Sequence, residues 1–383
     1  MKCALCGVET PLSTLAPLEI NRCPSCGAPE FTPMRLKGYW LYQPLGGGGM
    51  GSVYKAFHPG SHRLFAVKIL PREQAKDQDL VDSLLREGQA GAALGSHPNL
   101  VEIVDYGLDG DEYYMVSEFV EGERLDSLIE DVGRLNEGDT VCCALQIIQA
   151  ELHVVARGYL YRDLKPQNLI IEPDGNVRLF DYGLCVPLEA ASSPGGDGQD
   201  KLEGSPYFTP PERVVGAAEG EYSEIYSLGM LMYLMLCGNT YYKKSEVGVL
   251  LGKHVASARF ASVGARLKHC DPRSVEILDK MIARNPNARY HTLEALEHDL
   301  EELALRLAPG AELRDYRLKP TGTSAMPKER ANHAPLIAVV AAVAAALAAV
   351  SLAAYVLASD SALAEGLKEL VAKLVAKLLN PFG

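Results

Sequence analysis

A glycine-rich segment early in the chain has a spacing that suits the binding of phosphate groups. Gly46, Gly48 and Gly51 with Val53 form the pattern G-x-G-x-x-G-x-V, in which backbone without side chains can approach phosphate oxygens closely. A flexible hairpin and a dinucleotide-binding turn use similar glycines, but the dinucleotide turn leads into a helix. Here residues 53–57 continue as a strand. The strand-turn-strand order predicts a lid over nucleotide phosphates.

A lysine and a glutamate that follow form a candidate ion pair. Lys68 comes two residues after Ala66 in the apolar strand of residues 65–70, where a cation requires a partner. A lysine at a sheet edge that extends its ammonium into solvent is the alternative. The helical pattern that follows contains Glu87. We expect Glu87 to reach Lys68 and to orient it towards the phosphates.

Three oxygen-bearing side chains later in the chain complete a set that suits phosphoryl transfer. Asp163 and Asn168 lie five residues apart, and Asp181 follows within the motif Asp-Tyr-Gly. They come after the glycines, Lys68 and Glu87 in the order of the protein-kinase signature motifs. The chain therefore resembles the eukaryotic-type (Hanks-type) serine/threonine protein kinases of bacteria. Phosphoryl transfer needs positioned positive charge and a well-placed acceptor more than covalent chemistry.

The resemblance implies a role for each matching residue. Asp163 is expected to be the catalytic base that accepts the proton of the substrate hydroxyl, and Lys68 to anchor phosphates. Lys165 matches the lysine with which Ser/Thr kinases steady the transferring phosphoryl group. Asn168 and Asp181 would bind Mg²⁺ or Mn²⁺. The ATP-binding residues implied are Gly46, Gly48, Gly51, Val53, Ala66, Lys68, Glu87, Asn168 and Asp181, with the backbone of Glu118 and Val120 at the adenine.

Some positions depart from the family pattern without removing a reacting group. Tyr161 and Tyr182 replace the usual histidine and phenylalanine. Glu224 replaces an aspartate that hydrogen-bonds the catalytic-loop backbone, and its extra methylene is expected to shift that loop. An error of about 1 Å can cost about 100-fold in rate. The resemblance also pairs Glu212 with Arg289.

One arginine predicts a regulatory phosphate. Arg162 precedes the proposed base, an arrangement that in relatives awaits a phosphate on the activation loop, because a buried arginine requires an anion. The candidate phosphorylation sites are Ser192 and Ser193, within the Gly/Ser-rich residues 190–198. An unmodified flexible loop is the alternative.

Four of the nine cysteines crowd the first 26 residues as two Cys-x-x-Cys pairs with sixteen residues between them: Cys3, Cys6, Cys23 and Cys26. A glycine follows each pair, which allows the tight turn that aims two sulfurs at one metal. The spacing resembles that of a zinc ribbon, with a redox dithiol or an iron site as alternatives. Four thiolates leave no open position, so the Zn²⁺ would be structural, and a head of about 30 residues would need it to fold.

Hydrophobic patterning indicates the elements that must position these residues. Short apolar runs come first between about residues 37 and 307, and longer segments with a 3.6-residue period follow. With the resemblance, this order predicts an α+β, bilobal protein-kinase fold. The expected domains are a zinc ribbon at 1–34, a kinase domain at 38–305 with an N-lobe at 38–120 and a C-lobe at 121–305, and a linker at 308–333.

A long apolar segment predicts a membrane span. Residues 336–358 contain eleven Leu, Ile, Val or Tyr, eleven Ala and one Ser, without any Lys, Arg, Asp or Glu. At about 1.5 Å per residue such a helix covers about 34 Å, enough for a hydrocarbon core of about 30 Å. An alanine-rich soluble helix is the alternative, but it would carry more polar residues. We expect one transmembrane helix at residues 335–358.

Charges around this segment predict its orientation. Five Lys or Arg residues lie between positions 314 and 330, whereas the three lysines that follow the span lie farther away. Because positive flanks stay on the cytoplasmic side, a single-pass membrane protein with a cytoplasmic kinase domain is expected. Residues 360–383 repeat leucines every three or four positions. This amphipathic tail would lie at the membrane interface or join two copies in a homodimer.

Composition and charge limit the function classes. Hydrophobic residues make up 48% and charged residues 22% of the 383 residues, as in ordinary globular chains. The net charge of −12 gives no basic surface for a phosphate backbone, so nucleic acid is not an expected partner. Protein substrates are expected instead.

Two hypotheses of different classes follow. The leading one is ATP-dependent phosphorylation of serine and threonine on proteins, including autophosphorylation, at the cytoplasmic face of a membrane. The alternative is a pseudokinase that binds nucleotide or partners as a scaffold without turnover. Retention of Lys68, Glu87, Asp163, Asn168 and Asp181 together favours the enzyme.

Overall fold

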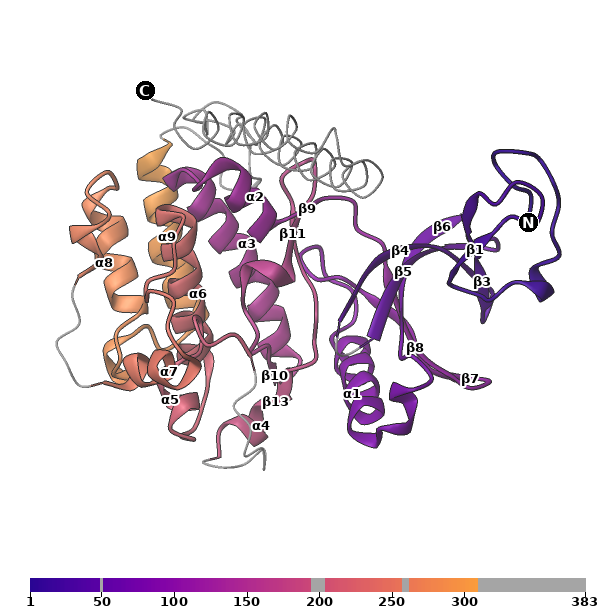
Figure 1. The fold of residues 1–383 in the computed structure, drawn as a ribbon. Coiled ribbons are helices and arrows are strands. Elements are labelled where there is room, and N and C mark those ends of the chain that lie inside the picture. The colour runs from indigo at the N-terminus through magenta and orange to yellow at the C-terminus, as the bar shows by residue number, and fades with distance from the viewer. Residues whose placement is uncertain (49–50, 194–203, 257–261, 309–383) are drawn as a thin grey trace, which may run out of the picture. The chain divides into compact units, whose positions relative to one another are not determined.

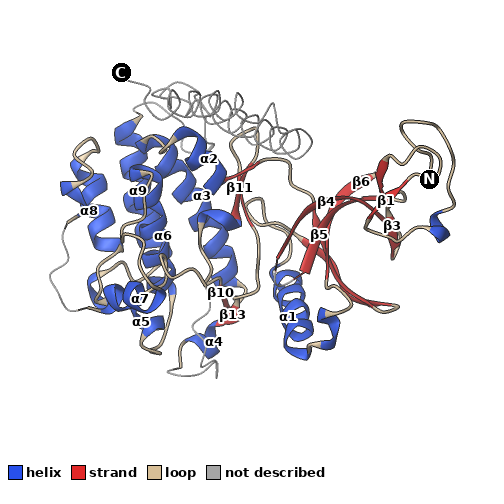
Figure 2. Ribbon diagram, viewed as in Figure 1, coloured by secondary structure: helices blue, strands red, loops and turns tan. Residues whose placement is uncertain are grey.

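The computed structural model of the protein describes residues 1–48, 51–193, 204–256 and 262–308 (Figure 1). The predicted membrane span at 335–358 and the predicted tail at 360–383 lie outside the described residues. Within the described residues, the large sheet and one helix lie in the first part of the chain, and most of the helices follow, with a few short strands among them (Figure 2).

One antiparallel sheet forms the N-lobe. Its strands, in spatial order, are β3 (Met34–Leu36), β4 (Tyr39–Gly48), β5 (Gly51–His58), β6 (Arg63–Ile69), β8 (Glu112–Glu118) and β7 (Ile103–Asp109). The β6 strand shows how the sequence sets its two faces. Phe65, Val67 and Ile69 are buried in the N-lobe core, whereas Ala66 and Lys68 alternate with them and are half-buried. The alternation turns Lys68 away from this core.

Helix α1 (Gln78–Leu94) packs on this sheet at very short range. The Asp77 side chain caps its first turn by accepting from the Asp79 backbone N–H. Gly91 has no side chain, and a Cβ there would come within 2.2 Å of Ile103 on β7 and 2.8 Å of Tyr182. The glycine therefore lets the helix approach the sheet closely enough for Glu87, one turn earlier, to reach β6.

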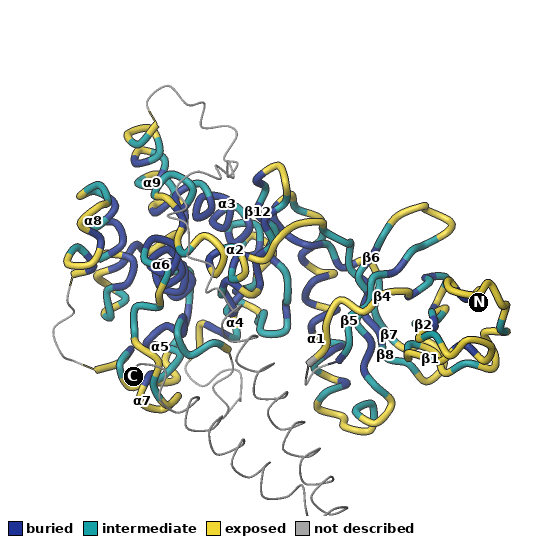
Figure 3. The backbone as a smooth tube through the Cα atoms, turned by 45° about the horizontal axis from the view of Figure 1, so that its top comes forward, coloured by how far each residue is buried: buried dark blue, intermediate teal, exposed yellow. Residues whose placement is uncertain are grey.

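Helices dominate the C-lobe. They are α2 (Leu125–Val132), α3 (Glu137–Ala156), α4 (Leu188–Ala191), α5 (Pro211–Val214), α6 (Glu221–Cys237), α7 (Val247–Val255), α8 (Pro272–Met281) and α9 (Leu293–Leu307). The two central helices, α3 and α6, are buried along most of their length (Figure 3). Among the described residues, α3 alone is long and apolar enough to cross a membrane, and most of its residues pack inside the C-lobe core.

Two small sheets hold the segments that carry the predicted catalytic residues. One pairs β10 (Tyr159–Leu160) with β13 (Val186–Pro187), and the other contains β9 (Glu123–Arg124), β11 (Leu169–Ile171) and β12 (Val177–Leu179). The loop between β10 and β11 contains Asp163 and Asn168, and Asp181 comes just after β12. Short strands on both sides fix the ends of both loops.

A buried carboxyl group lies on α3. Glu151 is 1% exposed, and within the described part of the chain neither of its carboxyl oxygens has a hydrogen-bond partner. Burial raises the pKa of Glu151 well above its ordinary value, and the nearby carboxylates of Glu224 and Glu221 raise it further. Glu151 therefore holds a proton in the folded protein at pH values where the unfolded chain has lost it.

We expect Glu151→Leu to stabilise the protein by about 1–4 kcal/mol at pH 8, because it replaces an unpaired buried carboxyl with an apolar side chain. The gain should shrink as pH falls towards the ordinary carboxyl pKa, where the unfolded chain also binds the proton. Thermal unfolding of both proteins from pH 5 to 8 measures the difference. Glu151→Gln is the matched control, since it removes the titration but keeps a polar group. A gain that is independent of pH would contradict this account.

Candidate active site

The glycine-rich hairpin lies against the strand that carries Lys68. Gly46 pairs with Val53 and Gly48 with Gly51 across β4 and β5, and residues 49–50 lie outside the description. Gly51 has φ +119°, and a Cβ there would lie 2.8 Å from the backbone oxygen of Ile69. Only glycine fits this approach. Because Ser52 pairs with Ile69, the second strand of the hairpin lies directly beside the end of β6.

Lys68 and Glu87 form the predicted ion pair. The Lys68 Nζ lies 2.6 Å from Glu87 Oε2, and the two side chains are 18% and 8% exposed. Burial raises the pKa of Glu87, while the Lys68 ammonium opposes that rise. Because a buried charge is stable only with a partner, the pair holds the ammonium at the end of β6 in a fixed direction.

Asp163 lies in a closely bonded loop. Lys165 Nζ lies 2.5 Å from Asp163 Oδ2, and the Asn168 side-chain amide donates to Asp163 Oδ2 at 2.9 Å and to the Asp163 backbone oxygen at 3.0 Å. Burial raises the pKa of Asp163, and Lys165 opposes this rise. Gly204, from the segment before α5, lies so close that a Cβ there would be 3.5 Å from Asp163 Oδ1. The missing side chain leaves room beside that oxygen.

Asp181 lies near both groups of residues. Its carboxylate raises the pKa of both Glu87 and Asp163, as a carboxylate near the ion pair and the catalytic loop does. The Phe180 backbone N–H donates to the Asn168 backbone oxygen at 3.1 Å and ties the two loops together. Asp181 itself has φ +70°, an uncommon conformation for a residue with a side chain. Six predicted residues therefore gather in one region: Lys68, Glu87, Asp163, Lys165, Asn168 and Asp181.

The donor atoms at this site fit a magnesium ion. The Asn168 side-chain nitrogen donates to Asp163, which leaves its oxygen for other partners. Asp181 adds a half-buried carboxylate. Magnesium prefers carboxylate and carbonyl oxygens, so these two side chains would hold it together with phosphate oxygens.

The predicted adenine-contacting segment follows β8. Glu118 is the last residue of β8, and Val120 comes two residues later. The Glu118 side chain accepts from the Glu102 backbone N–H at 2.9 Å and from Arg178 of β12. The sequence interpretation assigned Glu118 only a backbone role. In the structure its carboxylate also links the connection between the lobes to the C-lobe.

Both tyrosine departures keep their hydroxyls satisfied in the core. Tyr182 is buried, and its hydroxyl donates to the Val101 backbone oxygen at 2.7 Å. The Tyr161 hydroxyl donates to the Phe180 backbone oxygen at 2.5 Å. The two rings lie 6.3 Å apart in an edge-to-face arrangement. The substitutions therefore add hydrogen bonds to the segments on either side of Asp181.

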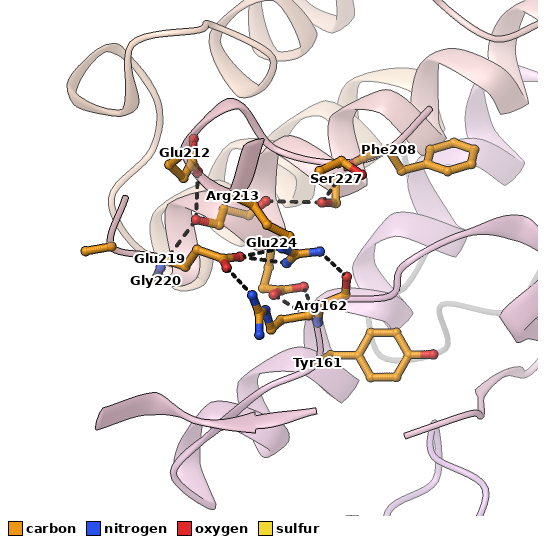
Figure 4. A network of polar contacts seen from close by, with 12 residues as sticks. Tyr161, Arg162, Phe208, Glu212, Arg213, Glu219, Gly220, Glu224 and Ser227 are labelled. Carbon is orange, nitrogen blue, oxygen red and sulfur yellow. Dashed lines mark hydrogen bonds and ion pairs between the residues drawn. The ribbon is translucent and has the colours of Figure 1, made fainter. Parts of the chain in front are cut away.

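Glu224 keeps its contact with the catalytic loop despite the extra methylene. Both of its carboxyl oxygens accept from the Arg162 backbone N–H, at 3.1 and 3.2 Å (Figure 4). Burial raises the pKa of Glu224 to about 7, and the nearby Arg213 opposes the rise. Glutamate therefore makes the contact expected of the usual aspartate, and the predicted shift of the loop stays a prediction. The predicted pair of Glu212 and Arg289 also forms, with N–O distances of 2.7 and 2.9 Å.

The two candidate phosphorylation sites lie at the end of α4. Ser192 and Ser193 are exposed, and their hydroxyls donate back to the Leu188 and Glu189 backbone oxygens at 2.7 and 3.5 Å. Arg162, the residue expected to receive a phosphate, instead contacts the buried carboxylate of Glu219. The sequence interpretation did not identify Glu219, and no motif marks it.

The four head cysteines converge as predicted. Their sulfurs lie within 4.8 Å of one another, with Cys3 to Cys26 at 3.7 Å and Cys6 to Cys23 at 3.6 Å. A tetrahedron with Zn–S bonds of about 2.3 Å has edges of about 3.8 Å, so the thiols fit a zinc ion. The glycines after each pair both have φ +74°, as the tight turns require.

Comparison with known proteins shows the family of the chain. A family model described as a protein kinase domain matches residues 39–300. The chain belongs to this family. It is 33% identical to the serine/threonine-protein kinase PrkC of Bacillus subtilis over 70% of this chain and 41% of that protein. It is 32% identical to the maternal embryonic leucine zipper kinase of Danio rerio over 70% of this chain and 38% of that protein. The chain spans about two fifths of the length of these curated relatives.

Proposed function

We propose that the protein transfers the γ-phosphoryl group of ATP to serine and threonine side chains of proteins, including its own. The single observation that carries this proposal is the geometry at Asp163, a buried carboxylate held by Lys165 and Asn168 beside Asp181. The named Ser/Thr kinases among its relatives support the choice of acceptor.

The proposed roles follow from the positions of the side chains. Asp163 accepts the proton of the acceptor hydroxyl, because its Oδ1 faces the space left by Gly204. Lys165 lies against the same carboxylate and places positive charge where negative charge develops on the transferred group. Lys68, fixed by Glu87, holds phosphate oxygens. A magnesium ion held by Asn168 and Asp181 would neutralise charge on the phosphates.

The remaining proposed ATP contacts lie on the N-lobe side. The hairpin glycines would cover the phosphates, and Val53 and Ala66, on adjacent strands β5 and β6, would pack on the adenine with backbone of Glu118 and Val120 beside it. Zn²⁺ at the four cysteines would be structural. We also propose that residues 335–358 anchor the protein in a membrane with the kinase domain on the cytoplasmic side, on the strength of their composition and flanking charge.

The acceptor class can be tested directly. We expect the full chain with labelled ATP and Mg²⁺ to label peptides that carry serine or threonine, and to label itself. Matched peptides that differ only in a serine, threonine or tyrosine acceptor measure the preference. Label on tyrosine alone would overturn the acceptor class, and nucleotide binding without any transfer would favour the pseudokinase scaffold.

A further inference from the structure

A buried carboxylate joins two arginines behind the catalytic loop. Arg162 donates to Glu219 Oε1 at 2.6 Å, and Arg213 donates to Glu219 Oε2 through two nitrogens at 2.8 and 2.6 Å (Figure 4). The side chains of Arg162, Arg213 and Glu219 are 12%, 7% and 5% exposed. One carboxylate thus bridges two guanidinium groups in a site from which most water is excluded, where such bonds are strong.

This cluster fixes the backbone next to Asp163. Arg213 also donates to the Arg162 backbone oxygen at 2.5 Å, and the Arg162 backbone N–H donates to Glu224. Arg162 itself has φ +69°, a conformation that costs free energy in a residue with a side chain. Its backbone and its guanidinium are therefore held by groups of the same cluster, one residue before the proposed base.

The cluster already contains negatively charged groups beside its positively charged ones. Among the described residues, two guanidinium groups, from Arg162 and Arg213, face two carboxyl groups, from Glu219 and Glu224. Glu219 raises the pKa of Glu224, whereas both arginines lower it, so the four charges lie close enough to influence one another. A phosphate brought to the same arginines would have to displace or face these carboxylates, and like charges at short range repel.

The candidate phosphorylation sites adjoin this cluster. The Glu219 backbone N–H donates to the Ala191 backbone oxygen at 2.9 Å, and Ala191 directly precedes Ser192. The α4 segment is thereby attached to the cluster through backbone, without any group on the serines. The contact joins three segments that are far apart in sequence: the catalytic loop, the end of α4 and the segment after α5.

We propose that Glu219 is a positioning residue that takes the place of an activation-loop phosphate. Its carboxylate neutralises Arg162 and holds the catalytic loop in its working conformation, so the kinase does not require phosphorylation of Ser192 or Ser193. This inference rests on the proposed kinase function. The anion that Arg162 requires is then Glu219, a permanent part of the chain, in place of the phosphate expected from the sequence.

Steady-state kinetics test the proposal. The full chain, dephosphorylated and checked by mass spectrometry, is compared with Glu219→Gln and with the double variant Ser192→Ala, Ser193→Ala. We expect Glu219→Gln to lower kcat by about 10- to 100-fold with KM for ATP changed by less than about 3-fold, because the loop that holds the base is displaced. The serine variant and the dephosphorylated chain should stay within about 2-fold of the untreated protein. Glu276→Gln, an exposed charge removed from an ion pair on α8, is the control.

Hydrogen exchange gives a second readout that does not require activity. We expect faster exchange at residues 161–165 in Glu219→Gln, with unchanged exchange in the α3 core as evidence of folding. If the unmodified chain transfers phosphate and Glu219→Gln equals it in both measurements, the inference is wrong while the proposed function stands. A loss of activity on dephosphorylation or in the serine variant would also overturn it. If exchange changes in Glu219→Gln but neither the unmodified chain nor any variant transfers phosphate, the proposed function fails. The role of Glu219 in holding the catalytic loop then still stands.

Discussion

Replacing Asp163 by asparagine is expected to lower kcat for phosphoryl transfer by about 10²- to 10⁴-fold, the usual contribution of a general base. Asparagine has nearly the same shape, and its side-chain oxygen can still accept from Lys165 and Asn168, which both donate to Asp163 in the structure. The side chain loses its ability to take a proton but keeps its place. Binding of Mg·ATP should therefore change by less than about 3-fold, since the nucleotide contacts proposed for Lys68 and Asp181 are untouched.

Transfer of labelled phosphate to a serine peptide measures this loss, and nucleotide titration measures binding. Asp131→Asn, at an exposed position on α2, is the matched control and should match the unmodified protein. Transfer by Asp163→Asn within about 3-fold of the unmodified protein would show that another group accepts the proton. The unmodified enzyme should also lose activity as pH falls, because the base must be ionised. That loss should begin at a higher pH than for an ordinary aspartate, since burial raises the pKa of Asp163.

The residues that react were visible in the sequence because each occupies a motif of fixed local spacing. Asp163, Lys165 and Asn168 share one short loop, so a loop that positions one of them positions all three. The pairing of Lys68 with Glu87 was also predicted, because a lysine in an apolar strand demands a partner and the next helix offers one. Their contact at 2.6 Å confirms that reasoning.

The residues that support the site were not visible, because their partners are set by the path of the chain in space. Glu219 meets Arg162 across 57 positions, and it lies in a run of small and acidic residues that reads as a surface loop. Its burial depends on α5 and α6, which bring Arg213 to the same place. Gly91 is similar, since nothing in its helical pattern shows that Ile103 and Tyr182 will approach it. For Glu224 the structure shows the contact with the Arg162 backbone N–H, whereas the predicted shift of the catalytic loop stays a prediction.

Removal of zinc is expected to unfold residues 1–34. In this segment the only buried residues are Cys3, Cys23 and Thr32, so the head has almost no apolar core of its own. The strands β1 (Ile20–Arg22) and β2 (Pro29–Phe31) form only a two-stranded sheet, which is marginal in water without further support. Structural zinc sites supply about 10–16 kcal/mol of binding free energy, far more than such a sheet can provide.

Metal content and thiol reactivity measure this prediction. We expect about one zinc per chain, with the head thiols protected from a thiol reagent until a chelator is added, and rapid proteolysis of the head afterwards. Cys6→Ser should lose the metal, whereas Cys270→Ser, at a half-buried position in the C-lobe, should retain it. Head thiols that react freely in protein containing no metal, with residues 1–34 still resistant to protease, would contradict the zinc site.

Residues 1–34 also contact the kinase N-lobe. Loss of the metal should therefore affect the stability of the N-lobe as well as that of the head. Leu18 packs against the N-lobe core, and the ring of Phe31 lies 6.3 Å from that of Tyr54 on β5, the strand that begins at the glycine-rich hairpin. Loss of the metal should therefore lower the melting temperature of the N-lobe by a few degrees. The residues around Asp163 lie in other elements, so kcat should fall far less than in Asp163→Asn. A loss of activity on chelation as large as in Asp163→Asn would contradict this expectation. It would mean that residues 1–34 position the hairpin over the phosphates in addition to stabilising the N-lobe.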